Sequence, residues 1–238
     1  MPEPYHHGDL KEALLAAAFR VLDAESLRAV TLRRLAREAG VSHAAPYHHF
    51  PDLDALLAGV AARGFDVLRE EMSERSAGEE AGPLGRLQAA GATYVTFAVT
   101  RPELFRLMFS GRWRDLSGHP GLREAERRAF EALQAMIVGA RGRREGDAQV
   151  VAAAARAAWA MVHGIAMLLV DGRIDTPPGM GPVEAAEQLT REVTAVLGTG
   201  LRSLSSSRGW RPSGRSPTGD GINRPRATER RPRPPSAG

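Results

Sequence analysis

The sequence predicts an all-α protein, and three observations support this class. Apolar residues recur every three or four positions through most of the first 202 residues, which is the period of an amphipathic helix. Over the same residues no segment keeps the alternation of apolar and polar side chains that is typical of a strand. Capping residues and prolines stand where several of the periodic segments begin. We therefore expect about nine helices joined by short loops.

The first four expected helices form an N-terminal group. Leu14 and Val21 lie on one apolar face of the first helix. Thr31 is placed to cap the second helix and Gly40 to end it, because glycine readily adopts the positive φ that often follows a helix. Asp52 is placed to cap the long fourth helix. These helices are expected at about residues 9–22, 31–39, 42–50 and 52–72.

Five more helices are expected after a break at residues 76–82 that is rich in Gly, Ser and Glu. Pro83 and Pro102 suit the first turn of a helix, where the missing proline N–H has no consequence. Trp159 and Leu169 belong to an alanine-rich helix that precedes a last amphipathic one. These helices are expected at about residues 83–101, 102–109, 122–140, 147–173 and 181–202.

The composition changes at Ser203. Residues 203–238 contain seven Ser, six Pro and five Gly, so they cannot bury enough apolar surface to offset the entropy of ordering, and we expect a disordered tail. This tail also holds eight arginines against Asp220 and Glu229, whereas residues 1–202 carry 24 Lys and Arg against 26 Asp and Glu. The basic character of the chain therefore belongs to the tail, and the expected folded part is slightly acidic.

Several classes of protein are excluded or disfavoured. The chain has no cysteine, which excludes disulfides and thiolate metal sites, and Lys11 is its single lysine, which excludes a phosphate-binding loop of the GxxxxGK[ST] type. Neither HExxH nor GxSxG occurs, so the sequence favours a protein that is not an enzyme and needs no cofactor or metal. No secretory signal or run of about 18 apolar residues is present, which indicates a soluble, cytoplasmic protein without membrane contact.

The most specific pattern is the segment Thr31–Phe50. Two short helices joined by Gly40, Val41 and Ser42 are typical of a helix-turn-helix, whose second helix enters the DNA major groove. Pro46 must lie in the first turn of that second helix, because further along it would remove a backbone hydrogen bond. The helix is therefore expected to begin at Ser42 or His43, with Ser42 as its cap.

This segment, with the capped helix that follows Asp52, resembles the DNA-binding domain of the TetR family of bacterial transcription regulators over residues 8–68. The resemblance implies that Thr31, Tyr47 and His48 contact phosphates. It also implies that the residues from Ser42 to Ala45 face the groove. Phe50 is expected in the core. The full set of expected DNA contacts is Thr31, Arg33, Ser42, His43, Ala44, Ala45, Tyr47 and His48.

Two features depart from the family pattern. Many members have Gly-Thr where this chain has Ala44-Ala45, which removes a hydroxyl contact. Many also have a lysine near the start of the fourth helix, where this chain has Leu53. The alternative for His48 and His49 is that they are solvated helix residues without a DNA contact.

Residues 83–202 are expected to form the effector-binding and dimerisation domain that the resemblance implies. The expected effector contacts are Tyr94, Phe97, Phe105, Met108, Trp159 and His163. The alternative for each of these residues is an ordinary place in the core. The run from Trp159 to Gly164 also resembles the Trp-His-Gly motif of one TetR subgroup.

The expected function is that of a homodimeric repressor that a small molecule releases from a palindromic operator. The last two long helices resemble the pair that forms the family's dimer interface, and a two-fold dimer would place its recognition helices about 34–36 Å apart. The alternative is an all-α carrier or enzyme with a vestigial helix-turn-helix. Its reactive groups would be His163 with Glu103, Asp171 or His119.

Overall fold

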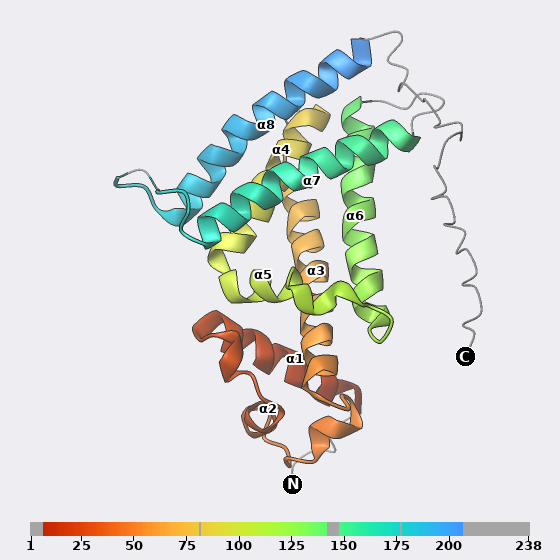
Figure 1. The fold of residues 1–238 in the computed structure, drawn as a ribbon, viewed down its shortest axis with the longest axis vertical. Coiled ribbons are helices and arrows are strands. Elements are labelled where there is room, and N and C mark those ends of the chain that lie inside the picture. The colour runs from red at the N-terminus through yellow and green to blue at the C-terminus, as the bar shows by residue number, and fades with distance from the viewer. Residues whose placement is uncertain (1–6, 81, 142–147, 177, 207–238) are drawn as a thin grey trace, which may run out of the picture. The chain divides into compact units, whose positions relative to one another are not determined.

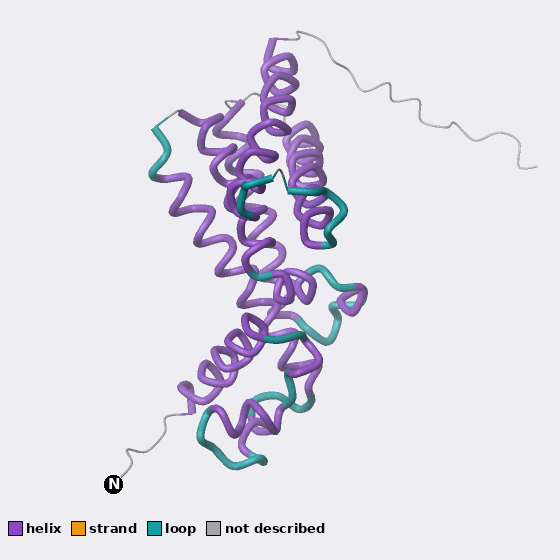
Figure 2. The backbone as a smooth tube through the Cα atoms, turned by 90° about the vertical axis from the view of Figure 1, so that its left-hand side faces the viewer, coloured by secondary structure: helices purple, strands orange, loops and turns teal. Residues whose placement is uncertain are grey.

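The structure, a computed structural model, describes residues 7–80, 82–141, 148–176 and 178–206. Within these ranges it contains eight α-helices, three 3-10 helices and no strand, which confirms the all-α prediction (Figures 1 and 2). The α-helices are α1 His7–Ala24, α2 Leu32–Glu38, α3 Leu53–Ala77, α4 Gly82–Thr100, α5 Pro102–Met108, α6 Pro120–Arg141, α7 Ala148–Val170 and α8 Pro182–Ser206. The 3-10 helices are η1 Leu27–Ala29, η2 Ala45–His48 and η3 Gly111–Arg114.

The head of the protein consists of α1, η1, α2, η2 and the first half of α3. Its apolar residues recur at helical spacing, so each helix turns one face inward. Leu14, Leu35 and Leu56 have no exposed surface, and Phe50 is 4% exposed. The expected place of Phe50 in the core is therefore confirmed.

The body of the protein consists of the second half of α3 together with α4 to α8. Helix α4 lies in its centre and contacts α3, α6, α7 and α8 (Figure 1). Gly91 permits this close packing, because a Cβ atom there would lie 3.3 Å from Val162 Cγ1 of α7 and 3.4 Å from Thr190 Cγ2 of α8. Helix α3 belongs to both head and body, and its 25 residues span about 37 Å.

Several boundaries differ from the expected ones. Helix α3 ends at Ala77, inside the expected break at residues 76–82, and α7 ends at Val170, three residues early. Residues 203–206 complete α8, so the helix continues four residues into the expected tail, and the rest of that tail lies outside the described residues. Helix α6 begins at Pro120, and the expected loop before it contains η3. Trp113 of η3 is buried and its Nε1–H donates to the Leu107 carbonyl oxygen (2.6 Å), which holds this loop against the body.

Helix α7 is the one helix in the described ranges that is long and apolar enough to cross a membrane by length and composition alone. Its buried residues pack inside the body, where Val151, Ala154, Ala155 and Ala158 form a cluster with Leu87 and Ile137. Of this apolar stretch, 33% is buried inside the body.

Candidate DNA-binding surface and apolar cavity

Helix α2 begins and ends as the sequence predicts. The Thr31 hydroxyl oxygen accepts the Arg34 backbone N–H (3.2 Å), which caps the first turn. At the other end Gly40 has a φ of +68°, where a residue with a Cβ atom would be strained. This turn lets the Val41 N–H donate to the Ala36 carbonyl oxygen (2.9 Å), which closes the helix and directs the chain toward η2.

The expected recognition helix is a single 3-10 turn, η2, and not an α-helix that begins at Ser42 or His43. An α-helix would need residue 46 to donate to the Ser42 carbonyl oxygen, but Pro46 has no N–H. That oxygen accepts the Ala45 N–H instead (3.1 Å), and the Ala44 oxygen accepts the Tyr47 N–H (3.2 Å). Pro46 does lie in the first turn, whereas the prediction that Ser42 caps the helix was wrong, because Ala44 occupies that position and makes no side-chain cap bond.

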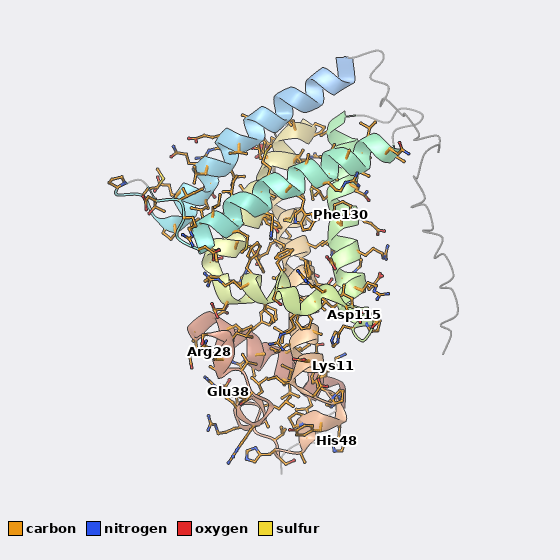
Figure 3. The ribbon with its side chains drawn as sticks, in the orientation of Figure 1. Lys11, Arg28, Glu38, His48, Asp115 and Phe130 are labelled. Atoms are coloured by element: carbon orange, nitrogen blue, oxygen red, sulfur yellow. The ribbon has the colours of Figure 1, made fainter. Side chains whose placement is uncertain are left out.

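The side chains around η2 form an exposed surface at one end of the head. Tyr47 is 57% exposed, which is unusual for a large aromatic side chain and leaves its hydroxyl open to a partner. Figure 3 shows His48 in this region, near the lower end of the view. Of the eight expected DNA contacts, Ala45 is half-buried; the exposed ones are Thr31, Arg33, Ser42, His43, Ala44, Tyr47 and His48.

The end of η2 is fixed to the rest of the head from two sides. The Phe50 N–H donates to the Pro46 carbonyl oxygen (2.9 Å), and the Phe50 ring lies against Gly59 of α3. The Asp52 carboxylate then accepts the Ala55 N–H (2.7 Å) and caps α3, as the sequence predicts. Helix α3 therefore starts three residues after Phe50, which anchors the recognition turn.

Arg34 links α2 to Glu25, the residue after α1, by contacts that the sequence did not reveal. Its Nη1 and Nη2 donate to the two carboxylate oxygens of Glu25 (3.0 and 2.7 Å), and its Nε donates to Glu38 (2.9 Å). These hydrogen bonds raise the pKa of Arg34 and lower the pKa of Glu25. The spacing of Arg34 and Glu38 by four residues is visible in the sequence, but the pair with Glu25 requires the fold.

Glu103 and Arg106 of α5 connect the head to the body. The Glu103 carboxylate accepts the Leu27 N–H of η1 (2.9 Å) and an Nη1–H of Arg106 (3.0 Å). The Nη2 of Arg106 donates to the Val170 carbonyl oxygen (2.7 Å) and to Asp171 (3.2 Å), at the C-terminal end of α7. A continuous set of polar contacts thus joins α7 to the segment between α1 and α2.

A largely apolar cavity of about 480 Å³ lies in the body between α3, α4, α6 and α7. Its volume is in the range typical of small-molecule sites. Aromatic rings follow one another along its wall, since Trp159 lies 6.3 Å from Phe130 and 6.4 Å from Phe109 between ring centroids. Its other apolar lining residues include Phe65, Leu68, Met72, Leu87, Leu133 and Val162.

Three polar groups at this wall bind to one another. The Tyr94 hydroxyl lies 2.8 Å from His163 Nδ1, and the Trp159 Nε1–H donates to the Tyr94 oxygen (3.3 Å). Burial lowers the pKa of His163 and raises the pKa of Tyr94, so both side chains are neutral at neutral pH. Neutral His163 can then accept a hydrogen bond from the Tyr94 hydroxyl at Nδ1.

The six expected effector contacts fall into three groups. Tyr94 and Trp159 line the cavity, and His163 contacts it through Tyr94. Phe97, Phe105 and Met108 are buried in the core and are not among the lining residues. The sequence reasoning missed Phe109 and Phe130 as lining residues, because helical spacing alone does not distinguish a cavity wall from a filled core.

No group of three or more His, Asp or Glu side chains that could hold a metal occurs in the part of the chain that the structure describes. Of the histidines near the N-terminus that a metal site could use, His43, His48 and His49 are within that part, whereas His6 lies outside it.

Comparisons with known proteins agree with this architecture. Residues 14–60 match the family described as "Bacterial regulatory proteins, tetR family", and residues 87–203 match "Tetracyclin repressor-like, C-terminal domain". The chain is 32% identical to a Rhodococcus sp. RHA1 protein of unknown function, with a TM-score of 0.69 and coverage of 84% of this chain and 98% of that one.

Two structures of lower identity share the fold. A TetR/AcrR-family regulator from Thermobifida fusca is 19% identical with a TM-score of 0.55, over 81% of this chain and 98% of that one. A tetR-family regulator from Streptomyces coelicolor is 19% identical with a TM-score of 0.57, over 82% and 89%. The chain matches both the N-terminal and the C-terminal domain of the family and contains the helix-turn-helix. These matches show that the protein belongs to the TetR family of bacterial regulatory proteins and is a DNA-binding transcriptional regulator.

Proposed function

We propose that the protein is a homodimeric repressor that leaves a palindromic operator when a small molecule binds in the body. The observation that carries this proposal is the position of α3. The helix contributes Phe65, Leu68 and Met72 to the cavity wall, and it begins at Leu53 directly after the recognition turn. A ligand that prefers one position of α3 would change the spacing of the two heads in the dimer.

The proposed DNA contacts divide into two kinds. Thr31, Arg33, Tyr47 and His48 are assigned to phosphates, since hydroxyl, guanidinium and imidazole groups can all donate to phosphate oxygens. The residues from Ser42 to Ala45 are assigned to base edges, where an alanine methyl can meet a thymine methyl. The exposure of seven of these eight residues supports the assignment.

The domain assignment is residues 8–68 for DNA binding, 83–206 for effector binding and dimerisation, and 207–238 for a tail, because residues 203–206 belong to α8. The dimer interface is assigned to α7 and α8. Leu168 of α7 and Val183 of α8 are 44% and 39% exposed, and such apolar side chains favour a partner surface. A second copy of the chain would cover them and would place two heads on one face of DNA.

We further assign the chain to the TetR subgroup with a Trp-His-Gly motif. Trp159 and His163 both contact the Tyr94 hydroxyl, which gives the first two residues of this motif a shared role beside the cavity. We also assign the protein to the cytoplasm, where its DNA target would be.

The alternative of a carrier or enzyme receives less support from the side-chain contacts. Glu103 and Asp171 both bind Arg106, and His163 is bonded to Tyr94. His119 packs edge-on against Trp113, with 5.5 Å between ring centroids. These four groups therefore lack the nucleophile and base arrangement that the alternative needs.

The test is fluorescence anisotropy with a labelled DNA fragment from the promoter of the protein's own gene. We expect saturable, salt-dependent binding by a dimer to a site with two-fold symmetry. If no compound that binds in the cavity changes the affinity for the operator, the proposed release by an effector is contradicted. A lack of any sequence-specific DNA binding would instead favour the carrier.

A further inference from the structure

We infer that the cavity takes an amphipathic carboxylate, with its apolar chain inside and its carboxylate at Arg156 of α7. This inference rests on the proposed function and adds the chemical class of the effector. Two observations support it. The polar groups of the cavity wall are hydrogen-bonded to one another, and the two ends of the cavity carry unequal charges.

The wall of the cavity favours an apolar ligand body. Tyr94 is 5% exposed, and its hydroxyl already has His163 and Trp159 as partners. The buried polar groups therefore do not need a ligand group to satisfy them, and a polar ligand atom would lose its water at this wall without a matching partner. This wall also presents apolar surface from three aromatic rings, those of Phe130, Trp159 and Phe109.

The charged lining residues are Arg123, Glu126 and Arg127 of α6 and Arg156 of α7. Arg127 binds Glu124 and Glu131, so its charge is compensated. Arg123 lies on the same helical face as Glu126, three residues away, so a carboxylate is close to it. These three residues make a mixed end of the cavity.

Arg156 lies at the other end. The part of α7 around it packs with Leu133, Met136 and Ile137 of α6, and Arg123 is ten residues from Leu133, about 15 Å along the helix. Arg156 forms no ion pair with any residue in the described ranges, and the acidic lining residue, Glu126, belongs to the mixed end. A ligand carboxylate at Arg156 would gain a charge-assisted hydrogen bond beside an apolar wall, while an amine would meet repulsion.

The experiment is isothermal titration calorimetry of the full chain with dodecanoate, dodecanol and dodecylamine, each below its micelle concentration. We expect the carboxylate to bind about threefold more tightly than the alcohol, since an exposed arginine contributes modestly, and the amine to bind most weakly. Arg156→Gln should remove the preference for the carboxylate, and Arg156→Lys should keep most of it.

Arg123→Gln is the matched control, because it removes the same type of charge from the mixed end and should leave the preference intact. Ala129→Phe, which fills the cavity, should weaken binding of all three probes. Equal affinity for the three probes, or an equal loss from Arg123→Gln and Arg156→Gln, would overturn the inference. Circular dichroism of each variant identifies a failure to fold. If dodecanoate does not bind but the protein still binds its operator, this inference fails and the proposed DNA-binding function stands.

Discussion

Replacement of Glu103 by alanine should loosen the head from the body at one identifiable hydrogen bond. The Glu103 carboxylate accepts the Leu27 N–H and also binds Arg106. Its side chain is 27% exposed, so we take the lower end of the range for a hydrogen bond to a charged group, about 1.5 kcal/mol. The exposed ion pair with Arg106, three residues away on α5, adds about 0.4 kcal/mol. The expected decrease in the free energy of unfolding is therefore about 2 kcal/mol.

Two measurements check this prediction. Urea unfolding at one fixed protein concentration gives the free energy, since the stability of a dimer depends on concentration. Amide hydrogen exchange then reports on the bond itself: the Leu27 amide should exchange about tenfold faster in Glu103→Ala, because 1.4 kcal/mol corresponds to a factor of ten. Glu103→Gln keeps a neutral acceptor and should show a smaller effect in both measurements.

Glu12→Ala is the matched control, because Glu12 is an exposed glutamate of α1. It should leave the free energy of unfolding within about 0.5 kcal/mol of the wild type. The reasoning would be refuted if Glu103→Ala behaved like Glu12→Ala, or if the Leu27 amide kept its wild-type exchange rate.

Four more predictions concern DNA recognition, pH and the tail. Arg34→Ala should weaken operator binding. Because the pKa of Glu25 is lowered in the folded state, the wild type should also lose the stability of the Arg34–Glu25 pair as pH falls through that lowered pKa. An Arg34→Ala variant with the same acid-unfolding profile as the wild type would contradict this. Tyr47→Ala should weaken binding to all operators alike, whereas His43→Ala should change base preference; a uniform loss from His43→Ala in anisotropy would argue against its place in the groove. Because the pKa of His163 is lowered by burial, the folded state should lose stability as pH falls through the ordinary histidine range, and urea titrations of His163→Gln should show a weaker dependence there. Deletion of residues 207–238 should reduce the salt dependence of nonspecific DNA binding without altering operator choice, and an altered choice would exclude a purely electrostatic role.

Local signals predicted the helix boundaries of the head well. Thr31, Gly40 and Asp52 act through backbone groups within a few residues, so their roles follow from the sequence near them. Pro46 was placed correctly in a first turn, but its effect on the type of helix was underestimated. The loss of one N–H in a segment of so few residues was enough to replace an α-helix by η2.

Contacts between distant parts of the chain could not be predicted in the same way. Leu27 and Glu103 are 76 residues apart, and neither residue type indicates the other. The cavity presents the same difficulty, since Tyr94 lines it while Phe97 and Phe105, aromatic residues on the same pattern, fill the core. Helical spacing tells which face of a helix is buried, but the relative positions of four helices decide where space remains between them.

The way in which the recognition turn is held has a consequence for how such a regulator evolves. Its shape depends on Pro46 and Phe50, which are buried, whereas Ser42, His43 and Ala44 are exposed. Mutations at these three exposed positions therefore carry little penalty for folding. New operator preferences can arise by single substitutions there, and a duplicated gene could acquire a separate set of target promoters while the effector response of its body stays the same.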